Sequence, residues 1–368
     1  MKRSYFGLIS VLCVLFLHSC KQGGYSTTVG VILPLTGDVA VYGNAIKNGI
    51  DLALDESDIK EDIRLIIEDD QGETKTATTI FNKLLLQKTD IIIGGGMSSV
   101  AAALAPIAQK EQITLLSPTA SLPSLTNSGK YFFRIWPSDN YEGYITADYI
   151  ANIMQKKRAA VLYVNLDYGV GMNNVFSEEF SKRGGQIVFS EGYAQGATDF
   201  RTQLVKIRNN NPDVLYIPGY YQEVANILRQ VKDINLDVQI LGISSLYDER
   251  IIQLAGDQAE GIIFTYPSYD SNSEDETVQV FVKNYSARFG NTPDAFAAHG
   301  YDAMKVVEYA IKQLKKKSAP VTRETLRNEI SKVSDFNGVS GKFSFDENGD
   351  VIKSMRFMTV RNGEFVQL

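Results

Sequence analysis

The chain has 368 residues, of which 44% are hydrophobic, 22% charged and 10% aromatic. This composition is that of an ordinary folded protein and excludes disordered and fibrous classes. The length suggests two domains, although a single α/β barrel also fits it. The 37 basic and 43 acidic side chains leave a formal charge of -6, which makes nucleic acid a poor candidate partner. Two cysteines and two histidines are too few for most metal sites, and we expect neither a metal nor a cofactor.

Residues 1–19 are predicted to be an export signal. Two basic residues precede an almost unbroken apolar run over 5–17, which is too short to span a bilayer in the mature protein. The run ends in the letters LHSC, which resemble a bacterial lipobox and predict cleavage before Cys20 and lipidation of that cysteine. An ordinary signal peptide with a chance cysteine is the alternative. Residues 20–28 would then form a polar tether.

The mature chain would hold no intramolecular disulfide. Cys13 lies within the signal and Cys20 would be acylated, so no cysteine pair remains in spite of the oxidising compartment. The single mature histidine, His299, is expected to be a packed or surface side chain and not a metal ligand. We expect an extracytoplasmic lipoprotein, held at its membrane in the periplasm or on the cell surface.

Short β-branched runs alternate with longer segments of helical period from residue 29 onward. Strands are predicted at 29–35, 63–69, 90–95, 113–117, 159–165, 186–191, 213–218, 238–242 and 261–266. Helices are predicted between them at 44–54, 74–87, 98–111, 141–155, 171–183, 199–209 and 223–234. A repeated strand and helix indicates parallel sheets that are covered on both faces, and so an α/β fold.

Long helices replace this alternation toward the end of the chain. They are predicted at 276–288, 297–316 and 323–333. A closing pair of strands follows, joined at Asn348-Gly349, a pair that supplies the positive φ angles of a tight hairpin. The sequence has no low-complexity linker between the predicted domains. We therefore expect the chain to cross between two lobes more than once.

A glycine-rich turn is a candidate site for an anion. Gly94, Gly95 and Gly96 follow a predicted strand and precede Ser98, a candidate N-cap, so free backbone N–H groups and the helix dipole would meet there. A carboxylate fits better than a phosphate because no basic residue stands near. The spacing is that of neither a P-loop nor a dinucleotide-binding motif. No acyl-transfer triad has convincing members, and we do not expect an enzyme.

Four tyrosines fall just after predicted strands. They are Tyr42, Tyr168, Tyr220 and Tyr221. Open α/β sheets bind ligands at the carboxyl ends of their strands, so this shared position favours contact with a ligand. Packing at the rim of the sheet is the alternative for each tyrosine.

Several segments together resemble the branched-chain amino acid binding proteins of bacterial ABC importers. They are TGDVAVYGNAIKNGI (36–50), IIGGGMSSVAAALAPIAQKEQITLLSPTASLPSLT (92–126), YGVGMNNVF (168–176), GYYQEVANILRQ (219–230) and LAGDQAEGI (254–262). The resemblance implies the type I periplasmic-binding-protein fold, with two doubly wound parallel-sheet lobes, a three-crossover hinge and a ligand cleft. Residues 27–139 with 268–344 would form the N-terminal lobe, and residues 140–267 with 345–368 the C-terminal lobe.

The resemblance also implies which residues contact the ligand. Carried over by position, they are Tyr42, Ser98, Thr119, Ser121, Tyr168, Tyr220 and Phe296. Ser98 and its neighbouring amides would hold a carboxylate. The Thr119 carbonyl and the Ser121 hydroxyl would accept hydrogen bonds from an α-ammonium, and the aromatic residues would enclose the rest of the ligand.

One position departs from the pattern of the amino-acid binders. Where they place an acid that pairs with the ammonium, this chain has Ser244 and Ser245, and we keep Ser244 in the predicted site. A buried ammonium without a counter-charge is strongly unfavourable. Glu223, Asp248 and Asp270 are candidates to supply that charge. Otherwise the ligand is a carboxylate without an amine, or a neutral amide-like solute.

These features predict a monomeric, lipid-anchored receptor. It would capture a small amino acid or a related carboxylate by hinge closure and deliver it to the permease of an ABC transporter. A sensor of the same fold, coupled to a signalling partner, is the alternative from the regulatory class. An enzyme in the cleft is a third hypothesis, which no motif supports.

Overall fold

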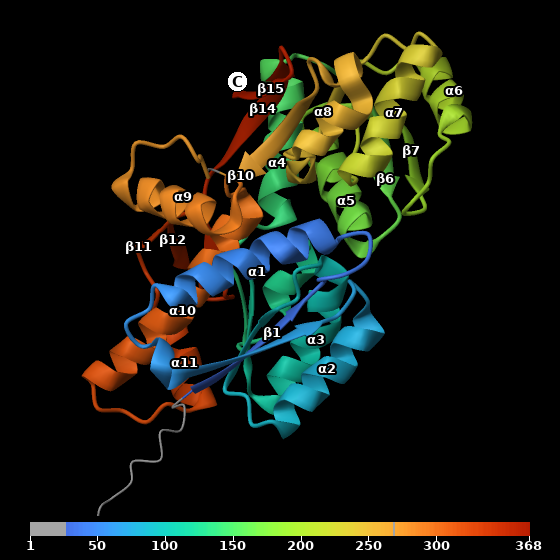
Figure 1. Ribbon diagram of the computed structural model, residues 1–368. Coiled ribbons are helices and arrows are strands. Elements are labelled where there is room, and N and C mark those ends of the chain that lie inside the picture. Colours follow the sequence, from blue (N-terminus) through green and yellow to red (C-terminus); the bar gives the residue numbers. More distant parts are fainter. Residues whose placement is uncertain (1–26, 268) are drawn as a thin grey trace, which may run out of the picture.

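Parallel sheets form the centres of two lobes, which lie one above the other in Figure 1. The computed structural model describes residues 27–267 and 269–368. The predicted signal at 1–19, Cys20 and most of the tether lie outside the described residues. Thr27 and Thr28, which the expected tether included, are the first residues of a strand. Among the described residues, no helix combines the length and the apolar character that a membrane span needs.

The sheet of the first lobe runs in the order β2-β1-β3-β4-β5, with all neighbours parallel. Its strands are β1 (Thr27–Leu33), β2 (Ile63–Asp69), β3 (Ile91–Gly94), β4 (Thr114–Ser117) and β5 (Phe132–Arg134). Its helices are α1 (Ala40–Asp55), α2 (Thr74–Leu86) and α3 (Ser98–Glu111), with α10 (Ala295–Lys316) and α11 (Arg323–Ile330) from later in the chain. In the central strand β3, Ile91 and Ile93 pack with α1 and α10, whereas Ile92 packs with α2 and α3. Because both faces are covered, the strand is continuously apolar.

The sheet of the second lobe runs in the order β15-β14-β10-β9-β8-β6-β7. Its strands are β6 (Arg158–Val164), β7 (Gln186–Tyr193), β8 (Val214–Tyr216), β9 (Gln239–Gly242), β10 (Ile263–Pro267), β14 (Met355–Arg361) and β15 (Glu364–Gln367). Strands β6 to β10 run parallel, and β14 and β15 add an antiparallel edge. Its helices are α4 (Asp139–Asp148), α5 (Asp167–Lys182), α6 (Arg201–Asn209), α7 (Tyr221–Asp233) and α8 (Glu249–Ala255). The fold is therefore the expected α/β architecture of two parallel-sheet lobes.

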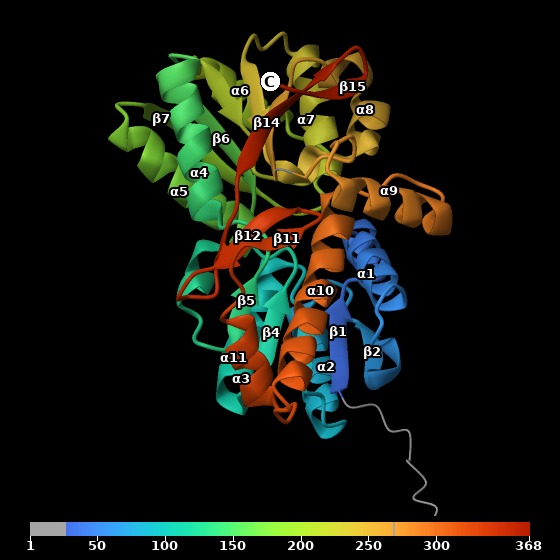
Figure 2. The ribbon, with the colours of Figure 1, turned by 90° about the vertical axis from the view of Figure 1, so that its left-hand side faces the viewer.

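A small antiparallel sheet of β11 (Phe336–Gly338), β12 (Gly341–Phe345) and β13 (Val351–Ile352) lies near the junction of the lobes (Figure 2). The other elements are helix α9 (Glu276–Phe289), the π-helical turn η3 (Tyr149–Ile153), and the 3-10 turns η1 (Lys60–Asp62), η2 (Pro123–Asn127), η4 (Ser244–Leu246) and η5 (Gly256–Ala259). The Asp346 carboxylate closes the turn between β12 and β13 by accepting backbone N–H groups of Asn348 and Asp350. The predicted pair of positive φ angles is wrong. Of the two residues, only Gly349 has a positive φ angle, of +81°. The hydrogen bonds to the Asp346 carboxylate hold the turn without a positive φ angle at Asn348.

Within the described residues the chain crosses between the lobes after β5, after β10 and between β13 and β14. Each crossing is a place where a relative rotation of the lobes can be absorbed. We propose the lobe division expected from the sequence, with its last boundary moved from residue 344 to beyond β13. The reason is that β13 pairs with β12, whereas β14 joins the second sheet.

Glycines allow α1 and α10 to cross in close contact. A Cβ atom on Gly49 would lie 2.0 Å from the Ala297 carbonyl oxygen, and one on Gly300 would lie 2.2 Å from the Ile46 carbonyl oxygen. A larger residue at either position would push the helices apart. This crossing joins the middle of α1 to the start of α10, and both helices carry aromatic residues of the site described next.

Candidate functional site

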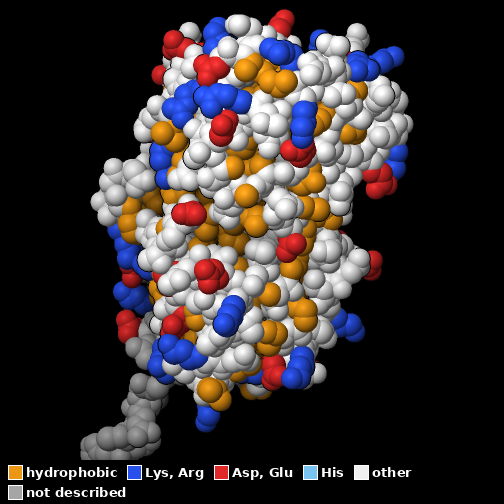
Figure 3. Space-filling view, turned by 90° about the vertical axis from the view of Figure 1, so that its right-hand side faces the viewer, with side chains coloured by type: hydrophobic (Ala, Val, Ile, Leu, Met, Phe, Trp, Pro, Cys, Tyr) orange, Lys and Arg blue, Asp and Glu red, His pale blue; other side chains and the backbone are white. Residues whose placement is uncertain are grey.

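A cavity lies where the two lobes meet. Its lining residues are Tyr42, Gly96, Met97, Ser98, Thr119, Ser121, Trp136, Tyr168, Tyr220, Ser244, Ser245 and Phe296. All eight residues that the sequence placed in a ligand site are members of this set. On the face shown in Figure 3, apolar side chains gather along the junction of the lobes.

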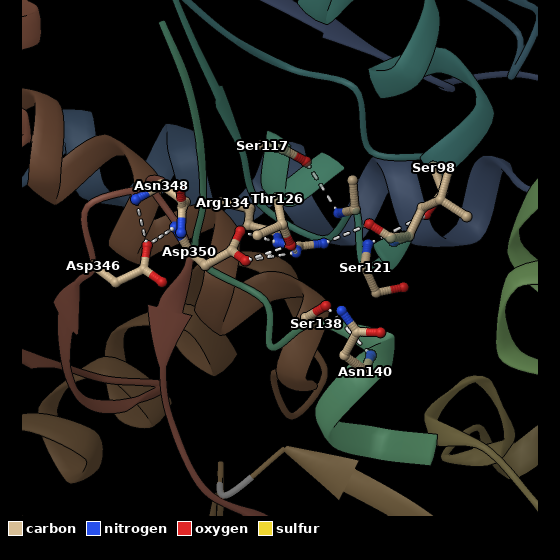
Figure 4. Close-up of polar contacts among 12 residues, drawn as sticks. Ser98, Ser117, Ser121, Thr126, Arg134, Ser138, Asn140, Asp346, Asn348 and Asp350 are labelled. Atoms are coloured by element: carbon tan, nitrogen blue, oxygen red, sulfur yellow. Dashed lines mark hydrogen bonds and ion pairs between the residues drawn. The ribbon is translucent and has the colours of Figure 1, made fainter. Parts of the chain in front are cut away.

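Hydrogen bonds join the loops that follow β3 and β4 and so build one wall of the cavity (Figure 4). Ser98 Oγ accepts from the backbone N–H groups of Ser121 and Leu122, at 3.2 and 3.3 Å. The Thr119 hydroxyl donates to the Gly96 carbonyl oxygen at 2.8 Å. Because Ser98 Oγ acts as an acceptor in both of its bonds, its own hydrogen is available to donate to an anion.

The expectation that Ser98 caps α3 is wrong. Met97 occupies the cap position and makes no side-chain hydrogen bond there, and Ser98 is the first residue of the helix. The hydroxyl turns toward the neighbouring loop because two buried N–H groups need an acceptor. The first backbone N–H groups of a helix have no partner within it and carry partial positive charge. Since α3 begins at the cavity wall, an anion in the cavity meets these groups as well.

Aromatic rings from both lobes enclose the rest of the cavity. Tyr42 and Phe296, from the first lobe, have ring centroids 4.7 Å apart, and Trp136 stacks on Phe296 at 5.2 Å. Tyr220, from the second lobe, lies 6.0 Å from Tyr42 and 6.2 Å from Tyr168. The cavity therefore offers a hydroxyl-rich side formed by serines and an apolar side formed by aromatic rings.

Burial sets the charge of the tyrosines. It raises the pKa of Tyr42, Tyr168 and Tyr220, so these hydroxyls are neutral at physiological pH. The lining residues include no lysine, arginine, aspartate or glutamate. An ionic group of a ligand must therefore be matched by hydroxyls, by backbone amides or by charges behind the lining.

None of the three acids suggested as counter-charges lines the cavity. Glu223 accepts a hydrogen bond from a backbone N–H, while Asp248 and Asp270 form ion pairs with arginines. The side chains of these three acids are directed to other partners, so their role as counter-charges stays a prediction.

Tyr221 and His299 are also absent from the lining. Tyr221 packs beneath the guanidinium of Arg250, which lies 4.2 Å from the ring centroid. His299 is fully buried and packs on Trp136, with ring centroids 4.6 Å apart. Of the two expected placements, packed or at the surface, His299 is therefore packed. Among the described residues, no cluster of three or more His, Cys, Asp or Glu could hold a metal ion.

Sequence reasoning missed Trp136 and two acids behind the lining, Asp139 and Glu142. Trp136 is the single tryptophan of the chain and comes just after β5, a position equivalent to that of the strand-end tyrosines. Asp139 and Glu142 lie in the first turn of α4, after the N-cap Ser138. Acids in a first turn usually face water and interact with the helix dipole, so their sequence position gave no sign of burial.

The sequence and the fold match known proteins along nearly the whole described chain. The periplasmic binding protein family matches residues 26–364. The Leu/Ile/Val-binding protein BraC3 of Rhizobium johnstonii is 28% identical over 333 residues, which are 88% of each chain. The crystal structure of a leucine binding protein, LivK, from Thermotoga maritima has a TM-score of 0.86 and 31% identity, covering 93% of this chain and 97% of its own. A solute binding protein from R. palustris in complex with benzoate has a TM-score of 0.84 and 25% identity, covering 93% and 95%.

Proposed function

Because this chain belongs to the periplasmic binding protein family, among the branched-chain amino acid binding proteins, we propose that it is a solute receptor of an ABC transporter. It captures a small amino acid or a related carboxylate in the cavity between its lobes and delivers it to the permease. The observation that carries this proposal is the lining of the cavity, to which both lobes contribute. A solute held there must be enclosed on both sides, so its binding favours the closed arrangement of the lobes.

The carboxylate of the solute would bind at the start of α3. The Ser98 hydroxyl and the first-turn N–H groups can donate to it, and the partial charge of the helix terminus favours an anion there. Tyr42, Trp136 and Phe296 would pack against the apolar part of the solute. Closure would then bring Tyr168 and Tyr220 of the second lobe over it.

The receptor would be held at its membrane by a lipid on Cys20, which lies outside the described residues. The LHSC motif after the apolar run supports this assignment. An anchor of two or more acyl chains retains a protein at a membrane far better than a single chain does. An anchored monomer can rotate its cleft toward the permease without leaving the surface.

A carboxylate without an amine is the second candidate for the solute. Ser244 and Ser245 stand where the resemblance predicts an acid, and the structurally similar protein from R. palustris was crystallised with benzoate. Aromatic lining residues can pack against such a ring.

Native mass spectrometry of the protein, purified from cells without added solute, tests the proposal. We expect a bound molecule that leaves on denaturation and that carries a carboxyl group. Protein with Ser98 replaced by alanine should retain much less of it. Protein that is empty and that binds no amino acid or small carboxylate in a panel would contradict the proposal.

A further inference from the structure

Two buried carboxylates lie just behind the lining of the cavity without the partners that buried charges need. Asp139 and Glu142 have no exposed surface. Both oxygens of Asp139 and Oε2 of Glu142 accept no hydrogen bond among the described residues. Oε1 of Glu142 accepts from the Thr265 hydroxyl and, at 3.4 Å, from the backbone N–H of Ser244. Buried carboxylates are normally paired or hydrogen-bonded, so this pair requires a positive group.

No cation of the chain is free to serve it within the described region. Arg134 is the positive side chain that acts on Asp139, but its guanidinium is bound by Asp350, Thr126 and a carbonyl oxygen. The other ionisable groups that interact with the pair are hydroxyls of Tyr168, Tyr216 and Tyr220.

Burial raises the pKa of Asp139 well above its ordinary value and that of Glu142 to about 7. When the cavity is empty, the Asp139 and Glu142 carboxyl groups therefore keep a proton near pH 7.

The pair is surrounded by residues of the cavity lining. The Asp139 backbone N–H donates to the Ser121 carbonyl oxygen at 2.8 Å, and the Ser121 hydroxyl lies beside the Asp139 carboxyl group, where it lowers the pKa of Asp139 against the larger effect of burial. On the other side, Glu142 contacts Ser244. Ser121 and Ser244 both line the cavity, from opposite lobes. A positive group in the cavity between these two serines would lie next to both carboxylates.

We propose that Asp139 and Glu142 supply the counter-charge for an ammonium group of the solute. This inference rests on the proposed function and narrows the solute to one that carries an amine as well as a carboxylate. Ser121 connects the two charged places, because its N–H bonds to Ser98, where the carboxylate binds, and its carbonyl oxygen bonds to Asp139. Ser121 alone therefore separates the place for the carboxylate from the place for the ammonium. This arrangement matches an α-amino acid, in which both groups stand on one carbon atom. The acid that the resemblance expects at position 244 is supplied from α4.

The test compares each amino acid with the acid of the same skeleton that lacks the amine. The pairs are leucine with 4-methylpentanoate and phenylalanine with 3-phenylpropanoate, measured by calorimetry. We expect the wild-type protein to prefer the amino acid. Asp139→Asn and Glu142→Gln should each weaken its binding by about ten- to a hundredfold, the range of a hydrogen bond to a charged group. Both variants should bind the amine-free acid as the wild type does.

Glu223→Gln is the matched control. Glu223 is also a buried glutamate in the first turn of a helix with an oxygen that has no partner, but it does not line the cavity or contact the pair. The control should leave the preference for the amino acid unchanged. If it reduces the preference while Asp139→Asn and Glu142→Gln do not, the counter-charge is misassigned.

Proton release gives a readout that a structural role would not produce. An ammonium beside the pair favours the charged form of the carboxyl groups, so its binding releases a proton to the solvent, and leucine binding near pH 7 should show an enthalpy that depends on the ionisation enthalpy of the buffer. The dependence should disappear in Glu142→Gln. Equal affinity for both members of a pair, or unchanged preference in both acid variants, overturns this inference but leaves the receptor function intact. Failure to bind either member of any pair overturns both.

Discussion

Arg134 and Asp350, which are 216 residues apart in the sequence, form a two-point ion pair beside the junction of the lobes (Figure 4). Nε of Arg134 lies 2.7 Å from Oδ1 of Asp350, and Nη2 lies 2.9 Å from Oδ2. Arg134 ends β5, where the chain first leaves the first lobe, and Asp350 precedes β13, where it leaves for the last time. The pair therefore ties two of the crossings together at their first-lobe ends. Nη1 of Arg134 also donates to the carbonyl oxygen of Leu122, next to Ser121.

Removing one partner of this ion pair should destabilise the protein strongly. Asp350→Asn leaves the guanidinium of Arg134, which has no exposed surface, without its counter-charge. Loss of one partner of a buried pair costs about 3–5 kcal/mol, which chemical denaturation can measure. The double variant Arg134→Met with Asp350→Leu should lose less than the sum of the two single changes. Additive losses would mean that the two side chains stabilise the fold independently.

Ser98→Ala should weaken carboxylate binding by about one to two decades, because it removes a hydrogen bond to a charged group worth roughly 1.5–3 kcal/mol. Ser117→Ala is the matched control. Ser117 joins the same loops, donating to the Gly95 carbonyl oxygen at 2.8 Å and accepting the Ala120 N–H at 3.0 Å, but it does not line the cavity. Calorimetry should show a much smaller loss for Ser117→Ala. Equal losses in the two variants would indicate that Ser98 acts only by holding the loops.

Lys353 makes the folding stability depend on pH. It is buried at the last crossing between the lobes, where Nζ donates to Ser340 Oγ at 2.6 Å and to His299 Nε2 at 3.2 Å. Burial lowers the pKa of Lys353 to about 7, although nearby Asp302 opposes the shift. The unfolded chain, in which lysine titrates near 10.4, therefore binds more protons than the folded chain above pH 7, so stability rises with pH there.

We expect Lys353 to contribute an increase of about 2 kcal/mol to the free energy of unfolding between pH 7 and 9, at about 1.4 kcal/mol for each pH unit of full proton difference, while the raised pKa values of Asp139 and Glu142 contribute in the opposite direction in wild type and variant alike. Lys353→Met should remove most of this increase. Burial lowers the pKa of His299, so that residue is neutral across the window and does not contribute to the slope. Urea denaturation at each pH measures the effect, and an equal slope in the variant would assign it to another group.

If Cys20 is lipidated, a fatty-acid analogue added to growing cells should label the wild-type protein. The labelled protein should then fractionate with membranes. Cys20→Ser should lose the label, because it lacks the residue that would carry the lipid, and it should stay uncleaved by the lipoprotein signal peptidase or be released in soluble form. Cys13→Ser is the control, because Cys13 lies within the signal and should leave labelling unchanged. Persistent label in Cys20→Ser would reject the lipobox interpretation.

The sequence predicted the sheets better than the short elements. The apolar run at 90–95 became β3 (Ile91–Gly94), and its neighbours in the sheet, β1 and β4, correspond to the runs predicted at 29–35 and 113–117. The short strands β5 and β11 were missed, whereas β8, which also has three residues, was predicted because it lies within the longer apolar run at 213–218. The antiparallel edge formed by β14 and β15 requires the chain to return to the second lobe after β13. No local sequence pattern predicts that return.

The site could be predicted where its residues follow strands, and not where packing decides their environment. Tyr42, Tyr168 and Ser98 lie in the first turns of helices that follow strands, so topology alone brings them together. Glu142 becomes buried through contacts with Ser244 and Thr265, more than 100 residues away. Its sequence position suggests an ordinary exposed first turn. Acids of this kind can be found only once the tertiary contacts are known.

Trp136 offers the most direct test of the central claim that a solute binds in the cavity between the lobes. It is the single tryptophan of the chain, it lines the cavity and it stacks on Phe296. Titration of the wild-type protein with leucine and with 4-methylpentanoate should produce a saturable change in tryptophan emission with one or both. Ser98→Ala should shift the midpoint to higher concentration, whereas Ser117→Ala should leave it nearly unchanged. Calorimetric binding without any change in Trp136 emission would place the solute outside this cavity and contradict the account.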